Sequence, residues 1–241
     1  MRFILIAFIF FNIICIANAS YNVYAPNQAG KINSSENMQT MFILDYSNSM
    51  NERIMGSSKF AILQRCFKNA LASFPESSAV GVRVYGQRWG FTNIDACRAS
   101  TLVEGINKYN HEIIEDKLTK YHPRGMTPIT YSLKETINKD FNMYGANNYM
   151  KHIILVTDGG ENCDESPCEY AMSLIKTRRD IKIDVIAINM DNADDLDQLR
   201  CTANVTGGRF YSTKTEADLK RNLDNVVRTK KDVEAKIMVN P

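Results

Sequence analysis

The sequence predicts an α/β fold of the Rossmann-like, doubly wound kind, with a mostly parallel sheet flanked by helices. Short apolar runs alternate along the chain with longer amphipathic segments, the pattern of a layered α/β protein. Two of the runs, "HIILVT" and "IDVIAI", are almost continuously apolar, as in central strands that are covered on both faces. With 241 residues, 44% hydrophobic and 23% charged, the composition is that of one globular domain.

Six segments have the apolar pattern of strands and six longer ones that of amphipathic helices. The predicted strands are Thr40–Leu44, Ala79–Tyr85, Ser100–Glu104, His152–Thr157, Ile183–Asn189 and Arg209–Ser212. The predicted helices are Lys59–Phe74, Asn110–Lys120, Pro128–Phe141, Glu165–Arg179, Ala193–Val205 and Glu216–Arg228. The ordered domain is expected to span residues 39–228. A charged tail, residues 229–241, contains "KIMV", which suggests an extra strand or the stub of something larger.

The N-terminus has the pattern of a secretory signal peptide, residues 1–19. One positive charge precedes an apolar stretch that closes with "ANA", a small-x-small cleavage pattern ending at Ala19. An uncleaved membrane anchor is the alternative, but about 15 apolar residues are short for a membrane span. Residues 20–38 read as a flexible leader. We therefore expect a secreted or periplasmic protein with no membrane insertion after cleavage, and the net charge of +2 gives no support for nucleic acid as a partner.

The cysteines indicate disulfides, since export implies an oxidising compartment. Cys66 lies in a helix-like stretch and is expected to be buried and unpaired. The other four, Cys97, Cys163, Cys168 and Cys201, allow three connectivities. A local pair between Cys163 and Cys168 is plausible, and the main alternative joins Cys97 to Cys163 and Cys168 to Cys201. Zinc binding by these cysteines is the rival interpretation.

Oxygen-bearing side chains stand where two predicted strands end. Asp45, Ser47 and Ser49 follow the first strand, Asp158 follows "HIILVT", and Thr127 precedes a helix. Ligands of open parallel sheets bind outside the carboxyl ends of the strands, so these residues converge if the first and fourth strands are neighbours. A set of oxygen donors without His or Cys suits Mg²⁺, Mn²⁺ or Ca²⁺ and argues against zinc or copper.

"DYSNS" at 45–49, Thr127 in "GMTP" and Asp158 in "TDGGE" resemble the metal-ion-dependent adhesion site (MIDAS) of von Willebrand factor type A domains. The resemblance covers roughly residues 39–228, and "VRVYG", "TDGGENCDESPC" and "TGGRFY" look like the bacterial branch of that family. It implies a mostly parallel six-stranded sheet and a function in binding proteins rather than in catalysis. It also implies that Ser47, Ser49 and Thr127 coordinate the ion directly or nearly so, and that Asp45 and Asp158 hold it directly or through water. A carboxylate of a partner protein would complete the shell.

Several of these residues also have ordinary structural explanations. Thr127 before Pro128 would make a good helix start, with threonine as the N-cap. Asp158 could belong to a simple turn. Glu161 could tune the site through a water molecule, although a solvated loop charge is the simpler interpretation. Trp89, the only tryptophan, could anchor an interface or could be buried against its own loop.

Two other functions compete with metal-dependent protein binding. A metal-dependent phosphohydrolase also begins with a strand that ends in an aspartate, but such enzymes need a second aspartate two residues later as general acid, and here that position is Ser47. Neither a GxxxxGK loop nor a Gly-x-Ser-x-Gly elbow occurs in the sequence. The third possibility is a disulfide-stabilised scaffold with an incidental metal site. We expect no catalysis.

Overall fold

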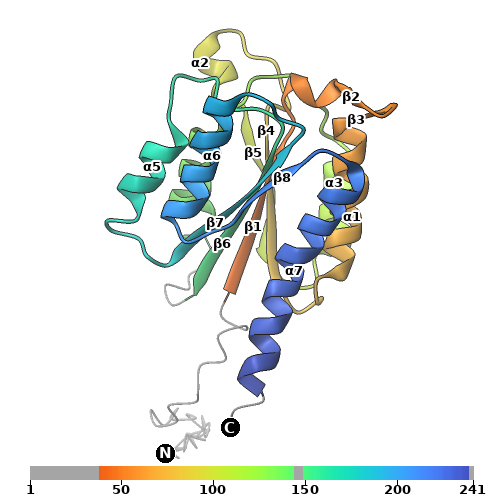
Figure 1. Cartoon of the computed structure of the whole chain (residues 1–241), viewed down its shortest axis with the longest axis vertical. Coiled ribbons are helices and arrows are strands. Elements are labelled where there is room, and N and C mark those ends of the chain that lie inside the picture. Colours follow the sequence, from red (N-terminus) through yellow and green to blue (C-terminus); the bar gives the residue numbers. More distant parts are fainter. Residues whose placement is uncertain (1–37, 144–148, 239–241) are drawn as a thin grey trace, which may run out of the picture. The chain divides into compact units, whose positions relative to one another are not determined.

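A six-stranded sheet forms the centre of the domain (Figure 1). The computed structural model of the chain describes residues 38–143 and 149–238, and side chains up to residue 227. The strands of the sheet are β1 Met38–Asp45, β4 Ala79–Tyr85, β5 Ser100–Asn107, β6 Met150–Thr157, β7 Ile181–Ile188 and β8 Phe210–Thr213. They lie in the order β5-β4-β1-β6-β7-β8, and every neighbouring pair is parallel except the antiparallel pair of β4 and β5.

β1 is covered on both faces, which explains why its apolar residues are consecutive. Met41 and Ile43 belong to one hydrophobic core and Phe42 and Leu44 to the other, each 1% exposed or less. Side chains of a strand alternate between the two faces of its sheet, so this run of four residues contributes to both cores. The Phe42 ring also packs edge to face on Phe67 with 5.0 Å between the ring centroids.

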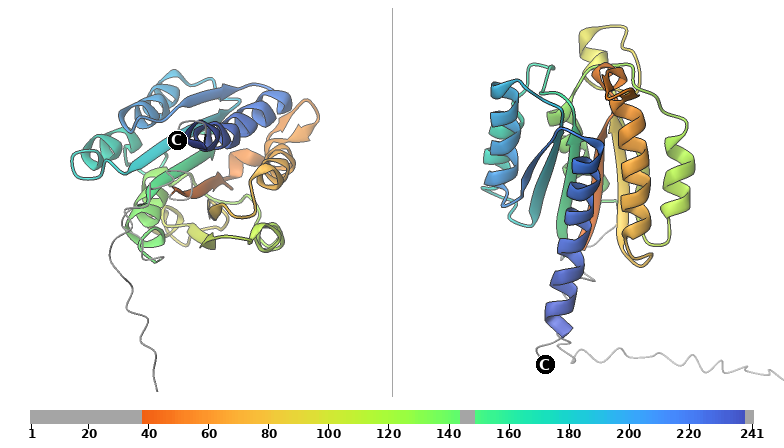
Figure 2. Two further views of the ribbon diagram at one scale, coloured as in Figure 1. Left: turned by 90° about the horizontal axis from the view of Figure 1, so that it is seen from below. Right: turned by 45° about the vertical axis from the view of Figure 1, so that its right-hand side comes forward.

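Helices cover both faces of the sheet, as the turned views of Figure 2 show. The helices on one face are α1 Lys59–Ser73, α3 His111–Leu118 and α7 Glu216–Met238. Those on the other face are α4 Ile129–Glu135, the π-helix η2 Thr136–Asp140, α5 Pro167–Leu174 and α6 Ala193–Val205. The short elements are the 3₁₀ helix η1 Asn48–Asn51, the hairpin of β2 Arg53–Ile54 and β3 Ser57–Ser58, and α2 Asn93–Ala96. In Figure 1, α2 and the hairpin lie at the end of the domain where β1 finishes.

The predicted fold class is confirmed, including the adjacency of the first and fourth predicted strands, which are β1 and β6. The strand prediction Ala79–Tyr85 matches β4 residue for residue. The predicted signal peptide, residues 1–19, lies outside the described residues, as does all but the last residue of the predicted leader. Among the helices within the described ranges, none is both long and apolar enough to cross a membrane.

Three helix predictions were wrong in their extent, and one of them is α5, which spans Pro167–Leu174 and not Glu165–Arg179. The segment Pro128–Phe141 is not one α-helix, because α4 ends at Glu135 and the wider π turn of η2 follows. The last helix does not end at Arg228: α7 continues to Met238, so most of the predicted tail is helical rather than a strand. Its sequence "KKDVEAK" consists mainly of residues with good helix propensity, which outweighed the short apolar run after it.

The π turn of η2 places Asp140 opposite Arg83 of β4. The guanidinium donates two hydrogen bonds of 2.8 Å, from Nε and Nη2, to the two carboxylate oxygens of Asp140. Both side chains are at most 5% exposed. Burying either charge without the other would be costly, so the pair holds η2 against β4.

Candidate functional site

The chain turns where β1 ends, at Asp45. The Asp45 side chain is fully buried, and its Oδ1 accepts a hydrogen bond of 2.7 Å from the backbone N–H of Ser47. A bond from an aspartate side chain to the backbone two residues later stabilises a turn. Beyond this turn, the hydroxyl oxygens of Ser47 and Ser49 lie 2.9 Å apart. Alternate residues of the loop therefore bring their oxygen atoms together.

Asp158 reaches the same place from the end of β6. Its Oδ1 accepts a hydrogen bond of 2.7 Å from the Ser49 hydroxyl, and its backbone N–H lies 3.3 Å from Asp45 Oδ2. The Thr157 hydroxyl lies 2.9 Å from the same Asp45 oxygen and accepts a hydrogen bond from the Tyr85 hydroxyl. Four of the predicted site residues thus form one hydrogen-bonded group, here named the oxygen cluster: Asp45, Ser47, Ser49 and Asp158.

Thr127, the fifth predicted residue, lies beside the oxygen cluster on the loop before α4. Gly125 forms a parallel β-bridge with Ser47, and its carbonyl accepts a hydrogen bond of 2.9 Å from the Asn48 N–H. The Thr127 N–H donates to Asn162 Oδ1 at 2.7 Å, which ties Thr127 to the loop after β6. Thr127 is 4% exposed. Thr127 is therefore bonded directly to the loop after β6, and its own loop is bonded through Gly125 to the loop after β1.

Gly86, just after β4, permits this close approach of loops. Its φ of +71° lies in the left-handed region, which favours glycine. A Cβ at this position would lie 2.6 Å from the Met126 carbonyl oxygen and 2.7 Å from the Ser47 Cα. Any larger residue would push apart the segments that bear Ser47 and Thr127.

Glu161 helps to form the helix start that the sequence assigned to Thr127. Pro128, not Thr127, is the capping residue of α4. The N–H of Thr130, in the first turn of α4, donates a hydrogen bond of 2.7 Å to Glu161 Oε2. Oε1 of the same carboxylate accepts a hydrogen bond of 3.0 Å from the Cys163 N–H. Partial burial raises the pKa of Glu161. The prediction of a solvated loop charge at this position is therefore wrong, because the carboxylate joins the loop after β6 to α4.

Lys59, the first residue of α1, is a member of the site that the sequence prediction missed. Its ammonium lies 2.8 Å from Asp158 Oδ2 and 2.7 Å from Glu52 Oε2. Burial by itself would lower the pKa of Lys59, but the hydrogen bonds with Asp158 and Glu52 outweigh it and raise the pKa, so the ammonium is charged. The helix dipole disfavours a cation at a helix N-terminus, and this is the one local signal that marks the position.

The electrostatics of the oxygen cluster favour a cation. Burial, and after it the nearby charge of Asp158, together raise the pKa of Asp45 to about 7, although hydrogen bonds from Ser47 and Thr157 oppose the shift. A buried carboxylate beside another carboxylate is stabilised by any positive charge placed between them. A cation at this point would therefore relieve both causes of the shift.

The residues present fit a hard divalent cation by the chemistry of their donors. Within residues 38–143 and 149–238, no group of three or more His, Cys, Asp or Glu side chains is arranged to hold a metal ion. A metal here would depend on hydroxyl oxygens beside the two carboxylates of the cluster. An oxygen-only set of this kind, with room for water or an outside ligand, suits Mg²⁺, Mn²⁺ or Ca²⁺.

Two disulfides join segments that are distant in the sequence, and one of them includes the loop after β6. Cys97 is joined to Cys163, which links the segment after α2 to the loop after β6, and Cys168 is joined to Cys201, which links α5 to α6. The main alternative of the three connectivities is thus confirmed, and a local pair of Cys163 with Cys168 is wrong. Cys66 is free and buried, as predicted.

Large apolar side chains are exposed on residues 88–95, here named the apolar loop. Trp89 is 69% exposed, Phe91 103% and Ile94 69%, so the reading of Trp89 as buried against its own loop is wrong. The loop has its own supports: Arg88 Nη2 lies 2.7 Å from Asp95 Oδ1, and Asp95 Oδ2 accepts a hydrogen bond of 3.0 Å from the Phe91 N–H. These two interactions of Asp95 hold the apolar loop in place while its large apolar side chains remain exposed to solvent.

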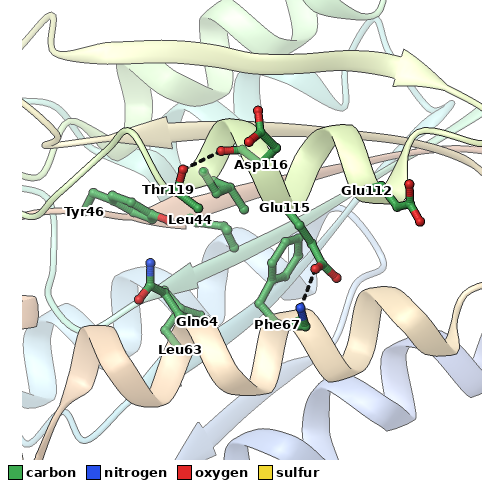
Figure 3. Close-up of a pocket in the computed structure, with 11 residues that line it drawn as sticks. Leu44, Tyr46, Leu63, Gln64, Phe67, Glu112, Glu115, Asp116 and Thr119 are labelled. Atoms are coloured by element: carbon green, nitrogen blue, oxygen red, sulfur yellow. Dashed lines mark hydrogen bonds and ion pairs between the residues drawn. The ribbon is translucent and has the colours of Figure 1, made fainter.

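A separate pocket of about 410 Å³ lies between α1 and α3 (Figure 3). Leu63 and Phe67 of α1 line it together with Tyr46, and Glu112 and Glu115 of α3 line it as well. None of the five predicted site residues lines this pocket. It is therefore distinct from the oxygen cluster, although Tyr46 directly follows Asp45.

The doubly wound sheet and the oxygen cluster at its carboxyl edge define the class of protein. The von Willebrand factor type A domain family matches residues 38–212, and the chain belongs to this family. Two proteins of Bacillus subtilis (strain 168), both described as uncharacterized, are similar in sequence. YwmC is 30% identical over 186 residues, which are 74% of this chain and 78% of YwmC. YwmD is 25% identical over 202 residues, which are 82% and 87% of the two chains.

Solved structures share the fold. The von Willebrand factor type A protein from Catenulispora acidiphila has a TM-score of 0.63 at 18% identity, covering 80% of this chain and 42% of that one. BatB from Bacteroides thetaiotaomicron has 0.62 at 14% identity, over 81% and 99%. Proximal thread matrix protein 1 from the mussel byssus, in a structure with a zinc-occupied MIDAS motif, has 0.59 at 20% identity, over 81% and 46%. At these identities the likeness concerns the fold alone.

Proposed function

We propose that this chain is a metal-dependent protein-binding domain. In this proposal an intact MIDAS holds Mg²⁺, or Mn²⁺ or Ca²⁺ in its place, and binds an acidic side chain of a partner protein. The observation that carries the proposal is the oxygen cluster, in which the ends of β1 and β6 meet through the 2.7 Å hydrogen bond between Ser49 and Asp158. Domains of this family often mediate metal-dependent protein interactions, in agreement with this arrangement.

Each predicted ligand has a defined task. The hydroxyls of Ser47, Ser49 and Thr127 would face the ion, while Asp45 and Asp158 would hold it directly or through water. Asp45 also fixes the backbone of Ser47 by their 2.7 Å hydrogen bond, so the loop is oriented before any ion binds. The metal, when bound, supplies an electrophilic centre for a carboxylate. Because the cluster contains only two carboxylates, their negative charge does not exceed the positive charge of a bound divalent ion.

The apolar loop supports a protein as the partner. Trp89, Phe91 and Ile94 are exposed, α2 lies at the end of the domain where β1 finishes (Figure 1), and the Cys97–Cys163 disulfide ties this region to the loop after β6. Aromatic anchors beside a polar centre are typical of protein interfaces, and clustered exposed apolar side chains mark interaction sites. We therefore expect the partner to bring an acidic side chain to the metal and apolar side chains to the loop.

The proposal includes export and excludes catalysis. The pattern of residues 1–19 predicts a signal peptide, and two disulfides agree with an oxidising compartment. N-terminal sequencing of the protein from its native source tests export, because the mature chain is expected to begin at Ser20.

Ser47 takes the position at which an aspartate-nucleophile phosphatase needs its general acid, so we expect no phosphatase turnover. Metal-dependent turnover that is lost in Asp45→Ala would contradict this.

The metal site is tested by titrating the chain with MgCl₂ in a calorimeter. We expect saturable binding in the wild type and its loss in Asp45→Ala and in Thr127→Ala, with the fold retained by circular dichroism. Asp197→Ala is the matched control, because it also removes an aspartate but one that is 71% exposed on α6. Absence of binding by the wild type, or binding that survives both site substitutions, would refute the metal site.

Partner binding is tested by affinity capture from the native source, with magnesium and with chelator in parallel. We expect a protein retained in magnesium and released by chelator, and not retained by Asp45→Ala. A double variant, Trp89→Ser with Phe91→Ser, is expected to lose the partner but to bind metal normally. Capture that is indifferent to chelator would favour the scaffold alternative, in which other surfaces bind.

A further inference from the structure

We propose that Lys59 is a built-in cation of the metal site. Its ammonium forms an ion pair with the Asp158 carboxylate when no metal is bound. It moves away from Asp158 when a divalent ion binds to that carboxylate. Lys59 thereby lowers the affinity of the site for metal and couples metal binding to a movement at the start of α1. This inference rests on the proposed function, since it concerns a divalent ion at the oxygen cluster.

The first step of the argument is that both oxygens of Asp158 are engaged. Oδ1 accepts the Ser49 hydroxyl at 2.7 Å, and Oδ2 lies 2.8 Å from Lys59 Nζ. The Asp158 side chain has no exposed surface and Lys59 is 4% exposed, so bulk water does not take part in the pair. A metal ion that approaches Asp158 therefore meets a carboxylate whose two oxygens each already have a partner.

The second step is that the two partners of Asp158 differ in what they can do. The Ser49 hydroxyl oxygen has free lone pairs and can itself ligate a metal ion while it keeps its place. The Lys59 ammonium has three donors and no acceptor, so it cannot ligate a cation and is repelled by one. Lys59 is consequently the group that has to give way.

The third step is that the displaced ammonium has a place to go. Lys59 Nζ already lies 2.7 Å from Glu52 Oε2, whose side chain is 67% exposed. The Glu52 backbone is also bonded to both sides of the site: its N–H donates to the Ser49 carbonyl at 2.9 Å, and its carbonyl accepts from the Lys59 N–H at 2.8 Å. A shift of the ammonium towards Glu52 would thus be felt at the loop that carries Ser49.

The charge balance gives the direction of the effect. With both carboxylates ionised, Asp45 and Asp158 carry a formal charge of −2, and Lys59 reduces it to −1, which weakens the attraction for a divalent cation. After such an ion binds, its two positive charges offset those of Asp45 and Asp158, and the displaced ammonium stays paired with Glu52. Lys59 thus lowers the affinity of the site for metal.

A purely structural ion pair makes the opposite prediction. If Lys59 only stabilised the fold, its removal would leave metal affinity unchanged or weaken it through local disorder. The sign of the change in metal affinity therefore separates the two explanations.

The experiment is calorimetric titration of the whole chain with MgCl₂ and, separately, MnCl₂. Lys59→Met keeps the length of the side chain but removes the charge, and we expect it to bind either ion at least about tenfold more tightly than the wild type. Lys59→Arg keeps the charge and is expected to bind like the wild type. Lys68→Met is the matched control on the same helix, because Lys68 is 68% exposed and pairs with Glu115.

A second measurement uses the wild-type chain and does not depend on the folding of a variant. In a sample labelled with ¹⁵N at lysine side chains, the signal of the Lys59 ammonium is expected to move as MgCl₂ is added, whereas that of Lys68 stays. If Lys59→Met binds no more tightly than the wild type, or if the Lys59 signal stays fixed while metal saturates, this inference is wrong and the metal site stands. If neither the wild type nor Lys59→Met binds either ion, the proposed metal site is itself wrong and the inference fails with it.

Discussion

The disulfide between Cys97 and Cys163 is predicted to be a main source of stability of this domain. It joins residues 66 apart in the sequence. If a crosslink acts by restricting the unfolded chain, closing a loop of that length stabilises the folded state by about 4 kcal/mol at 25 °C. Replacing both cysteines by serine should lower the free energy of unfolding by that amount, and the melting temperature by roughly 10 °C for a domain of this size.

Urea denaturation of oxidised protein, followed by far-ultraviolet circular dichroism, measures this loss. The comparison is the pair of substitutions Cys168→Ser and Cys201→Ser, which opens a crosslink of 33 residues and should cost about half a kcal/mol less. A loss below about 1 kcal/mol for Cys97→Ser with Cys163→Ser would refute the loop-closure reasoning. A reversed order of the two double variants would show that local contacts, not loop length, determine the cost.

Three further predictions concern other buried or paired groups. Arg83→Met should cost about 3–5 kcal/mol of unfolding free energy in urea, because it leaves the Asp140 carboxylate buried and unpaired; a cost below about 1 kcal/mol contradicts this. The Arg178 guanidinium lowers the pKa of Asp180, so their pairing stabilises the fold above the ordinary pKa of 3.8 and this stabilisation is lost as the pH falls below it. Asp180→Asn should therefore melt lower than the wild type at neutral pH and approach it in acid, and a constant difference would refute the pairing. Burial raises the pKa of the Cys66 thiol to about 11, so iodoacetamide at mildly alkaline pH should alkylate it only after unfolding, as measured by mass spectrometry.

The sheet could be predicted from the sequence because its strands are nearly continuous apolar runs. β4 was predicted residue for residue, and the central position of β1 follows from four consecutive core side chains. The convergence of Asp45 and Asp158 was also predictable, since neighbouring parallel strands end at the same edge. Local patterns are informative here because they report the direction and burial of single elements.

Contacts that depend on tertiary packing could not be predicted in the same way. The Lys59 ammonium pairs with a carboxylate 99 residues away, and nothing in the local sequence names that partner. The choice among three disulfide connectivities depends on which loops the sheet order brings together. Glu161 looked like a solvated charge because the two groups that donate hydrogen bonds to it, the N–H groups of Thr130 and Cys163, meet only in the folded chain.

The exposure of Trp89 determines what optical spectroscopy can report on this protein. Because Trp89 is the only tryptophan and is 69% exposed when the domain is folded, unfolding changes the surroundings of the indole little. The wavelength and intensity of the tryptophan emission are therefore expected to change little when the protein unfolds. The same property makes it a label-free signal for docking: a partner that covers the apolar loop should shift the emission to shorter wavelengths and protect it from acrylamide quenching.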